Sequence, residues 1–291
     1  MQHFHHLSGE YAIDGDLVQH IVSVSREDAT SDPLDERTLN LVMQEVRKHA
    51  SVAMLHERNI ARTKRAVSAS VSPDQLIVIT INTIEELDKI TNTLAKRLRD
   101  IYGLYDPELE HNTPEHPAFI VALLASAPRA QGTMGGAFTD EDLRVTREQA
   151  ERIRGLYAQR EQLLAYLDRL MQEHTPNLKR VAGSMIGGKL IALAGSMRRL
   201  SSMPAGTVQL LGAETALFRH LRNRSARPPK HGIIFNHVLL QRAPQRLRGK
   251  AARVIADKTS IAAKVDYFKG EYCGDTLYAE MERRIAAHDK K

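Results

Sequence analysis

Apolar residues recur every three or four positions between Pro73 and Tyr102, a stretch that neither Gly nor a further Pro interrupts. This spacing gathers the apolar side chains on one side of an α-helix of about eight turns. Gly103 and Pro107 favour an end just after Tyr102. The apolar run 76–79 is also compatible with a buried strand, although the unbroken pattern after it favours the helix. The predicted buried stripe comprises Ile77, Ile81, Ile84, Leu87, Ile90, Leu94, Leu98 and Ile101.

A second long amphipathic pattern begins at Thr139 and is broken by Pro176. Thr139, followed by three acidic residues, is typical of a helix N-cap and first turn. A shorter helical stretch, residues 117–127, and a Gly-rich segment separate the two long patterns. Because these patterns have similar lengths, we expect an antiparallel coiled-coil arm. The apolar stripe of the second helix comprises Ala150, Ile153, Tyr157, Leu164, Leu167 and Met171.

Periodic segments become shorter after Pro176 and are separated by Gly, Pro and Ser, which predicts a compact helical domain. Residues 35–66 also favour helix. The expected fold class is therefore all-α, with a long antiparallel coiled-coil arm joined to a compact helical domain. The expected divisions are a short N-terminal region of uncertain fold (1–70), the coiled-coil domain (71–175), the compact domain (176–270) and a polar tail (271–291).

Composition narrows the functional classes. The single cysteine, Cys273, excludes an internal disulfide and fits a reducing cytoplasm. The longest apolar runs, 76–81 and 119–127, are shorter than the ~18–20 residues that span a bilayer, so no membrane partner is expected. Residues 176–270 hold 18 Lys and Arg against three acids, a net charge of +15, which leaves −9 for the rest of a chain of net charge +6. A basic domain joined to an acidic remainder is typical of nucleic-acid-binding proteins.

Basic residues of the compact domain fall into two groups. On a helix predicted near 246–266, one face carries Arg246, Lys250, Arg253 and Lys264, joined by Asp257. Such a face can follow a phosphate backbone while the opposite face packs on the core; an ordinary solvated face is the alternative. The opposite face comprises Ala251, Val254, Ile255, Ile261, Ala262 and Val265. Lys258 lies among these apolar residues, so we expect it to find a carboxylate or a ligand, or to extend to water.

The second basic group lies in a proline-stiffened loop, "RNRSARPPKHG" (222–232). Its cations are Arg222, Arg224, Arg227 and Lys230. His231 beside Gly232 has a ring that can stack on an unpaired base, as in RNA-binding proteins.

The segment 183–190, "GSMIGGKL", is similar to the phosphate-binding loop of nucleotide hydrolases. Such a loop ends in Ser or Thr, which holds Mg²⁺, and it follows a buried strand. Leu190 occupies the last position, and charged helical residues precede the segment. A nucleotide-binding enzyme that uses Gly183 and Lys189 is therefore the weaker alternative, and close helix packing explains the glycines. We find no catalytic constellation and expect no metal, no cofactor and no enzymatic activity.

Several ordered blocks resemble the Nop-domain family. They are "LLGAETALFRHLR" (210–222), "PPKHGIIFNH" (228–237) and "RGKAARVIADKTSIAAKVDYF" (248–268), preceded by "PNLKRVAGSMIGGKLIALAGSMRRLSSMPAGTVQ" (176–209). Residues 72–109 are similar to the first coiled-coil helix of that family. The resemblance covers residues 72–270 and points to the archaeal core protein of box C/D small ribonucleoproteins.

The resemblance implies a non-enzymatic scaffold. A Nop domain would bind a kink-turn box C/D RNA together with a small ribosomal-type kink-turn-binding protein, and the coiled coil would mediate self-association. In the family, this scaffold positions fibrillarin for guide-directed ribose 2′-O-methylation. By position, Lys230, His231, Lys250 and Arg253 would face RNA. Gly212, Ala213, Glu214 and Phe218 would form the composite surface for the protein partner and the RNA stem.

Two features depart from the family pattern, one residue and the length of the N-terminal region. Thr215 stands where the family often has Lys, which removes a phosphate contact. The family also carries a longer N-terminal domain that docks fibrillarin, whereas about 70 residues precede the match here. The alternative is therefore a divergent Nop-domain RNA-binding protein that does not recruit fibrillarin.

Overall fold

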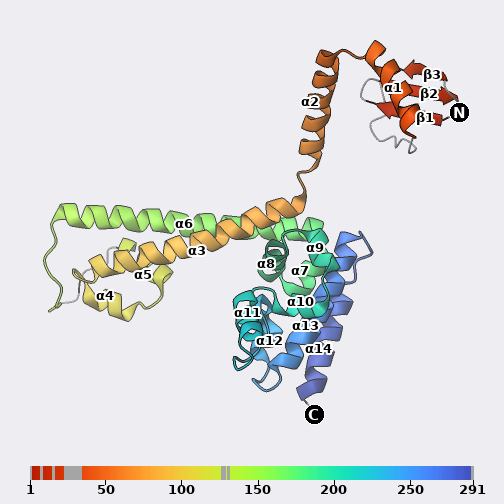
Figure 1. The fold of residues 1–291 in the computed structure, drawn as a ribbon. Helices are drawn as coiled ribbons and strands as arrows, with labels where there is room; N and C mark the ends of the chain where they lie inside the picture. The colour runs from red at the N-terminus through yellow and green to blue at the C-terminus, as the bar shows by residue number, and fades with distance from the viewer. Residues whose placement is uncertain are drawn as a thin grey trace. The chain divides into compact units, whose positions relative to one another are not determined.

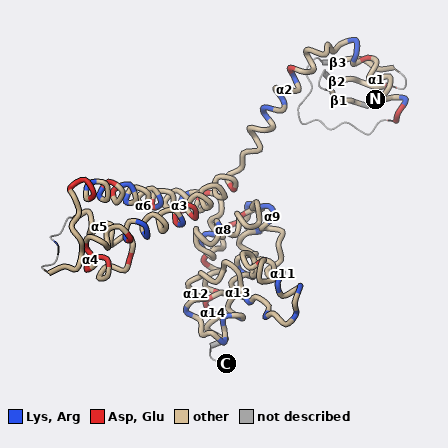
Figure 2. The backbone as a smooth tube through the Cα atoms, turned by 60° about the vertical axis from the view of Figure 1, so that its left-hand side comes forward, with Lys and Arg blue, Asp and Glu red and all other residues tan. Residues whose placement is uncertain are grey.

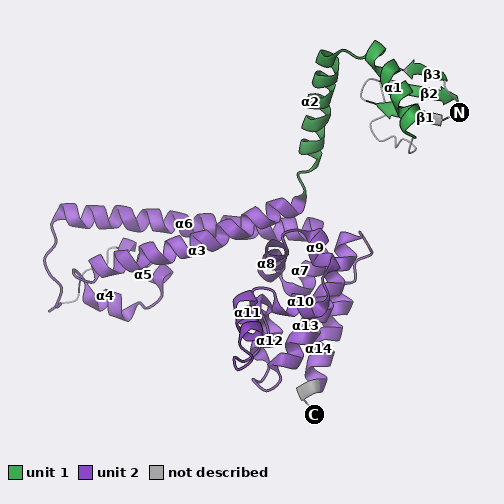
Figure 3. Ribbon diagram, viewed as in Figure 1, with its two compact units in different colours: residues 1–72 green, residues 73–291 purple. Residues whose placement is uncertain are grey.

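The computed structural model describes residues 2–6, 9–14, 17–22, 35–125, 129 and 132–289. The chain divides into two compact units, residues 1–72 and residues 73–291 (Figure 3). None of the helices in the described residues is long and apolar enough to cross a membrane.

Residues 1–72 contain a small antiparallel sheet that the sequence did not predict. Its strands are β1 (Gln2–His6), β2 (Gly9–Asp14) and β3 (Leu17–Val22), in the order β1-β2-β3. The helix α1 (Glu36–His49) packs on the sheet, and Tyr11, Ile13, Val42 and Val46 form the buried core between them. The helix α2 (Val52–Ala69) follows without a buried side chain. The helical expectation for residues 35–66 is confirmed. The fold is helical, as predicted, except for this small three-stranded sheet.

Two long helices form the predicted arm, α3 (Pro73–Tyr102) and α6 (Asp140–His174), which lie side by side in Figure 1. Residue pairs far apart in the chain show that they are antiparallel. Ile77 shares a core with Met171, Arg160 donates to Asp88, and Leu98 packs with Ile153. The Thr139 hydroxyl accepts from the backbone N–H of Asp142, whose carboxylate accepts from the backbone N–H of Thr139 in return. This reciprocal pair fixes the predicted start of α6.

The buried line of α3 differs from the predicted stripe in its outer half. Ile90 and Ile101 are 48% and 43% exposed, whereas Thr91, Ala95 and Tyr102 are buried. The buried line keeps the 3.6-residue period of the helix, so it passes through these neighbours. Small side chains on the contact line let α3 and α6 approach.

Two short helices, α4 (Pro107–Asn112) and α5 (His116–Ala125), pack at the tip of the arm. The predicted stretch 117–127 corresponds to α5, and its residues 126–127 lie outside the described residues. The guanidinium of Arg99 holds α4 to α3, because it donates to the Glu110 carboxylate and to the carbonyl oxygens of Glu110 and Thr113.

The remaining helices form the predicted compact domain, whose core is continuous with the base of the arm (Figure 1). They are α7 (Pro176–Ala182), α8 (Ser184–Ala194), α9 (Met197–Ser202), α10 (Ala205–Leu210), α11 (Glu214–Arg222), the 3₁₀ helix η1 (Ile233–Asn236), α12 (Val238–Arg242), α13 (Arg248–Tyr267) and α14 (Gly274–Asp289).

Within the expected polar tail (271–291), residues 274–289 form helix α14 in the structure. Helix α14 packs on α7 and α13. Its Leu277 and Met281 side chains are buried, and Tyr278 and Ile285 pack against the same core. The tail assignment is therefore corrected for α14, which apolar side chains anchor to the compact domain.

Candidate nucleic-acid interface

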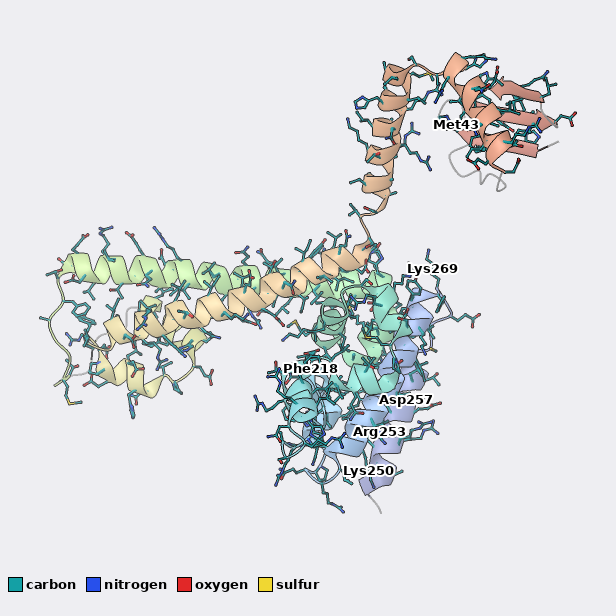
Figure 4. All side chains as sticks on the ribbon, viewed as in Figure 1. Met43, Phe218, Lys250, Arg253, Asp257 and Lys269 are labelled. Atoms are coloured by element: carbon teal, nitrogen blue, oxygen red, sulfur yellow. The ribbon has the colours of Figure 1, made fainter. Side chains whose placement is uncertain are left out.

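The helix α13 exposes three of the four cations predicted for one face of this region. Lys250, Arg253 and Lys264 are exposed, and Asp257 lies between them on the same side. Figure 4 shows Lys250, Arg253 and Asp257 in succession along this helix. Two details differ from the expectation. Arg246 precedes the first residue of α13, and Ile261 lies 37% exposed on the cationic side rather than in the core.

Four predicted RNA-facing cations surround one groove of about 640 Å³. Lys230 comes from the loop before η1, Arg246 from the turn before α13, and Lys250 and Arg253 from α13 itself. None of the described residues that line this groove is acidic. The complete lining is Gln209, Pro229, Lys230, Arg246, Gly249, Lys250, Arg253 and Val254. A concave surface lined by cations is suited to a polyanion, because their fields add where the ligand sits.

The loop that carries Lys230 is held against the end of α10 by three hydrogen bonds. The Gln209 amide nitrogen donates to the Lys230 carbonyl at 2.6 Å. The backbone N–H of Gly232 donates to the Gln209 carbonyl at 2.8 Å, and that of Ile233 to the Leu211 carbonyl at 2.7 Å. A Cβ on Gly232 would lie 1.8 Å from the Leu211 carbonyl oxygen, so this approach requires glycine. Sequence reasoning missed Gln209, which carries no charge or motif that would mark it.

His231 stacks within the protein. Its ring lies 4.6 Å from the Phe235 ring at an interplanar angle of 18°, and the Arg248 guanidinium lies 5.7 Å from the centre of Phe235. Burial lowers the pKa of His231 below its usual value. Because Phe235 covers one face of the His231 ring, only the other face is open to a base. Base stacking by His231 stays a prediction.

The residues assigned to the composite surface lie next to that loop. Gly212 adopts a left-handed conformation (φ 84°), and its N–H donates to the Glu214 carboxylate at 2.7 Å. A Cβ on Gly212 would lie 3.3 Å from the backbone nitrogen of Ile233, so the turn before α11 approaches the His231 loop. On α11, Phe218 and Leu221 are 62% and 65% exposed, and no side chain of this helix is buried. Ala213 lies between Gly212 and Glu214, and is half-buried.

Other predicted cations lie outside the groove. Lys264 is exposed on α13, about 17 Å along the helix from Arg253. Arg222 ends α11, and Arg227 lies in the loop after it; both are exposed. Figure 2 shows Lys and Arg mixed with Asp and Glu along the arm, whereas Lys and Arg predominate over the compact domain.

The segment 183–190 does not form a phosphate-binding loop. The helix α7, not a strand, precedes it, and Gly183 (φ 82°) links α7 to α8. Lys189 is paired with Glu85 of α3. A Cβ on Gly187 would lie 2.7 Å from the Met171 terminal methyl carbon, so this glycine permits close helix packing, as the sequence suggested.

Comparisons with known proteins identify relatives over most of the chain. The Nop family model, described as "snoRNA binding domain, fibrillarin", matches residues 118–287. An uncharacterized NOP5 family protein of Methanocaldococcus jannaschii is 40% identical over 79% of this chain and 61% of its own length. Nucleolar protein 58 of Sclerotinia sclerotiorum is 32% identical over 85% of this chain and 50% of its own length. The chain thus spans about half to three-fifths of the length of these relatives.

A solved chain from a fibrillarin/Nop5p complex shares the fold, with a TM-score of 0.52 and 24% identity over 98% of this chain and 99% of that chain. A second family model, an FAD binding domain, matches residues 32–159. The described part of that range is helical and contains no strand, whereas a dinucleotide-binding fold needs a parallel sheet. The Nop match covers more than half of the chain and agrees with its ordered blocks and its fold. The chain therefore belongs to the Nop family.

Proposed function

We propose that this chain is the RNA–protein scaffold of a box C/D-type ribonucleoprotein. It binds a kink-turn RNA together with the small protein that first recognises the kink-turn, and it supports ribose 2′-O-methylation without being the catalyst. The observation that carries the proposal is the convergence of Lys230, Arg246, Lys250 and Arg253 on one groove without a lining carboxylate. Phosphate contacts of this kind supply affinity and position, and not sequence specificity.

The protein partner occupies the surface formed by Gly212, Ala213, Glu214 and Phe218. Phe218 and Leu221 form an exposed apolar face on α11, beside the loop that carries His231. An apolar face next to cations suits a ligand that is part protein and part RNA, because the protein part can bury the apolar side chains while the RNA phosphates contact the cations.

Fibrillarin docks on residues 1–72 in this proposal. Support comes from the folded sheet and helix in that region and from the fold shared with a chain of a fibrillarin/Nop5p complex. The alternative, a divergent Nop protein that does not recruit fibrillarin, leaves this unit for another partner. A pull-down separates them, because only the first predicts that fibrillarin is retained by the intact chain and lost when residues 1–72 are removed.

The arm mediates self-association in an archaeal-type cytoplasm. Ile79, Ile90 and Ile101 are exposed along α3, and such a row of apolar side chains favours a helical partner. Light scattering should give twice the chain mass. A monomer at micromolar concentration would contradict this part of the proposal.

A gel-shift experiment tests the RNA function. The protein should shift a kink-turn RNA bound by its primary protein strongly, and the same RNA alone only weakly. Equal binding of any duplex, unaffected by the primary protein, would refute the composite site. The nucleotide-enzyme alternative predicts ATP or GTP turnover that is lost in Lys189→Ala, and we expect no turnover.

A further inference from the structure

We propose that the exposed side of α13 guides a single-stranded RNA segment from the cationic groove to an aromatic platform at the end of the helix, where a base stacks on Phe268. This inference rests on the proposed RNA function. It adds a second RNA contact, which is made with a single strand rather than with the kink-turn. Beyond Lys250 and Arg253, which line the groove, its residues belong to neither the groove nor the composite surface.

The exposed side of α13 forms a continuous row. Lys250, Arg253, Asp257, Ile261, Lys264 and Phe268 follow at spacings of three and four residues. Phe268 keeps the helical geometry, because its N–H donates to the Lys264 carbonyl at 3.0 Å. The row is about 27 Å long, since each residue advances the helix by about 1.5 Å. Figure 4 shows Lys250, Arg253 and Asp257 along α13 and Lys269 beyond its C-terminal end.

Aromatic side chains are exposed at this end. Phe268 is 75% exposed, and the Tyr267 ring meets it edge to face at a centroid distance of 5.1 Å. Tyr272, in the segment that leads to α14, is 53% exposed. The chain has six phenylalanines, and an exposed phenylalanine in a folded domain leaves a large apolar surface in water. Stacking against a base would bury it.

Charges around the platform favour RNA over a protein partner. Lys264 and Lys269 flank Phe268 and are exposed. Two neighbouring carboxylates are engaged within the protein: Asp266 accepts from the backbone N–H groups of Asn177 and Leu178, and Asp275 pairs with Arg180. Glu271 is an exposed acid beside the platform. Asp257 interrupts the row of cations midway, and its carboxylate forms an ion pair with Arg284 at 3.4 Å. Aromatic faces flanked by cations are typical of surfaces that bind single-stranded nucleic acid.

The ligand is single-stranded because of the geometry of stacking. A base within a duplex has both faces covered by its neighbours, so an aromatic side chain can stack only on an unpaired base or on the end of a helix. A flexible strand that leaves a kink-turn in the groove can follow the row of cations and place one base on Phe268.

The chain contains no tryptophan, which allows a direct optical test. Phe268→Trp places the sole indole on the platform, and Val121→Trp places one on the exposed side of α5 as the control. Two probes are used with the primary protein: a blunt kink-turn RNA and the same RNA with a ten-nucleotide single-stranded uridine extension. The extended RNA should quench the fluorescence of Phe268→Trp, whereas the blunt RNA should not, and neither should quench Val121→Trp.

Affinity gives a second readout in the otherwise unaltered protein. Phe268→Ala should bind the extended RNA roughly five- to hundredfold more weakly, with unchanged binding of the blunt RNA, and Phe268→Tyr should restore the affinity. Three outcomes would refute this inference alone. Phe268→Ala could lose the same affinity for both RNAs, it could lose affinity for neither, or the extended RNA could leave the fluorescence of Phe268→Trp unquenched. Weaker capture of the primary protein by Phe268→Ala without RNA would assign the platform to a protein and also refute it. If the unaltered protein binds no kink-turn RNA, the proposed function fails, and this inference fails with it.

Discussion

The ammonium group of Lys258, on the buried side of α13, is paired with the carboxylate of Glu280 on α14. Lys258 is 4% exposed and lies among the apolar residues of α13. The pair explains how a cation can occupy the apolar side of this helix, and it shows one way in which α14 is held to the domain. Hydrogen bonding from Lys258 also holds the pKa of Glu280 below its usual value.

Glu280→Gln should destabilise the protein more than Lys258→Met. The first change leaves a buried ammonium without a carboxylate, whereas the second removes the charge and retains an apolar side chain of similar length. Thermal unfolding should therefore give the lowest midpoint for Glu280→Gln. Glu282→Gln, an exposed change on the same helix, is the control and should match the unaltered protein. A higher midpoint for Glu280→Gln than for Lys258→Met would show that the pair does not stabilise the contact with α14.

Gly187→Ala should lower the free energy of unfolding by about 1–3 kcal/mol, because the added methyl group overpacks the contact of α8 with Met171 and Leu178. Gly155→Ala is a matched control within the same unit. Gly155 is exposed in the middle of α6 with no atom within 4 Å of an added Cβ, so this change should stabilise the protein by about 0.5–1 kcal/mol. Urea unfolding measures both. A stabilising effect of Gly187→Ala would contradict the packing role of this glycine.

The arm was predictable because local patterns determine it. An apolar residue every three or four positions and the Thr139 cap act within one or two helical turns, so the sequence shows them directly. The sheet of residues 2–22 was not predictable in this way. Its strands are five or six residues long. Among its apolar residues whose burial the structure describes, the buried ones are the consecutive Tyr11, Ala12 and Ile13, which leaves little alternation to detect. Helix α14 was also missed, because its core side chains, Leu277, Tyr278, Met281 and Ile285, alternate with charged and small residues and form no long apolar stripe.

The sequence singled out the four cations that line the candidate groove, but it did not show the geometry that brings them together. Lys250 and Arg253 share a helix side, which follows from their spacing. Lys230 joins them only because Gln209 and Leu211 hold its loop against the end of α10. The sequence suggests His231 as a residue that can stack on a base, but it does not show that Phe235 already covers one face of its ring. The contacts of Gln209 and Leu211 with the loop join residues that are distant in the chain, and no local pattern encodes them.

Lowering the pH from 7.5 to 5.5 should destabilise the protein partly through His237. Burial lowers the pKa of His237, whose Nε2 donates to the Val181 carbonyl at 2.9 Å while Nδ1 accepts from the Leu239 N–H. In the unfolded chain the group takes up a proton as the pH falls through about 6.5, whereas in the folded chain it does not until lower pH. The free energy of unfolding therefore falls by at most about 1.4 kcal/mol per pH unit from this group.

Urea unfolding of His237→Gln at the two pH values checks this expectation. The variant should be less stable at pH 7.5, because it loses hydrogen bonds, but it should lose less stability on acidification than the unaltered protein. His56→Gln, an exposed change on α2, is the control for replacing a histidine by glutamine. The same loss on acidification in His237→Gln and in the unaltered protein would assign the effect to other groups.

Lys250→Ala and Arg253→Ala should each weaken RNA binding and make it less sensitive to salt. Each side chain that neutralises a phosphate releases a counterion, so the slope of log K against log[salt] should become less steep by roughly 0.7–0.9 per removed contact. The double variant should show about the sum if each of the two side chains, which line the same groove, neutralises its own phosphate. Arg152→Ala removes an exposed arginine from α6 and tests whether net charge alone is responsible. Affinity measured by fluorescence anisotropy between about 50 and 200 mM salt gives the slopes. An unchanged slope in the double variant, or the same change in Arg152→Ala, would mean that the groove does not hold the RNA backbone.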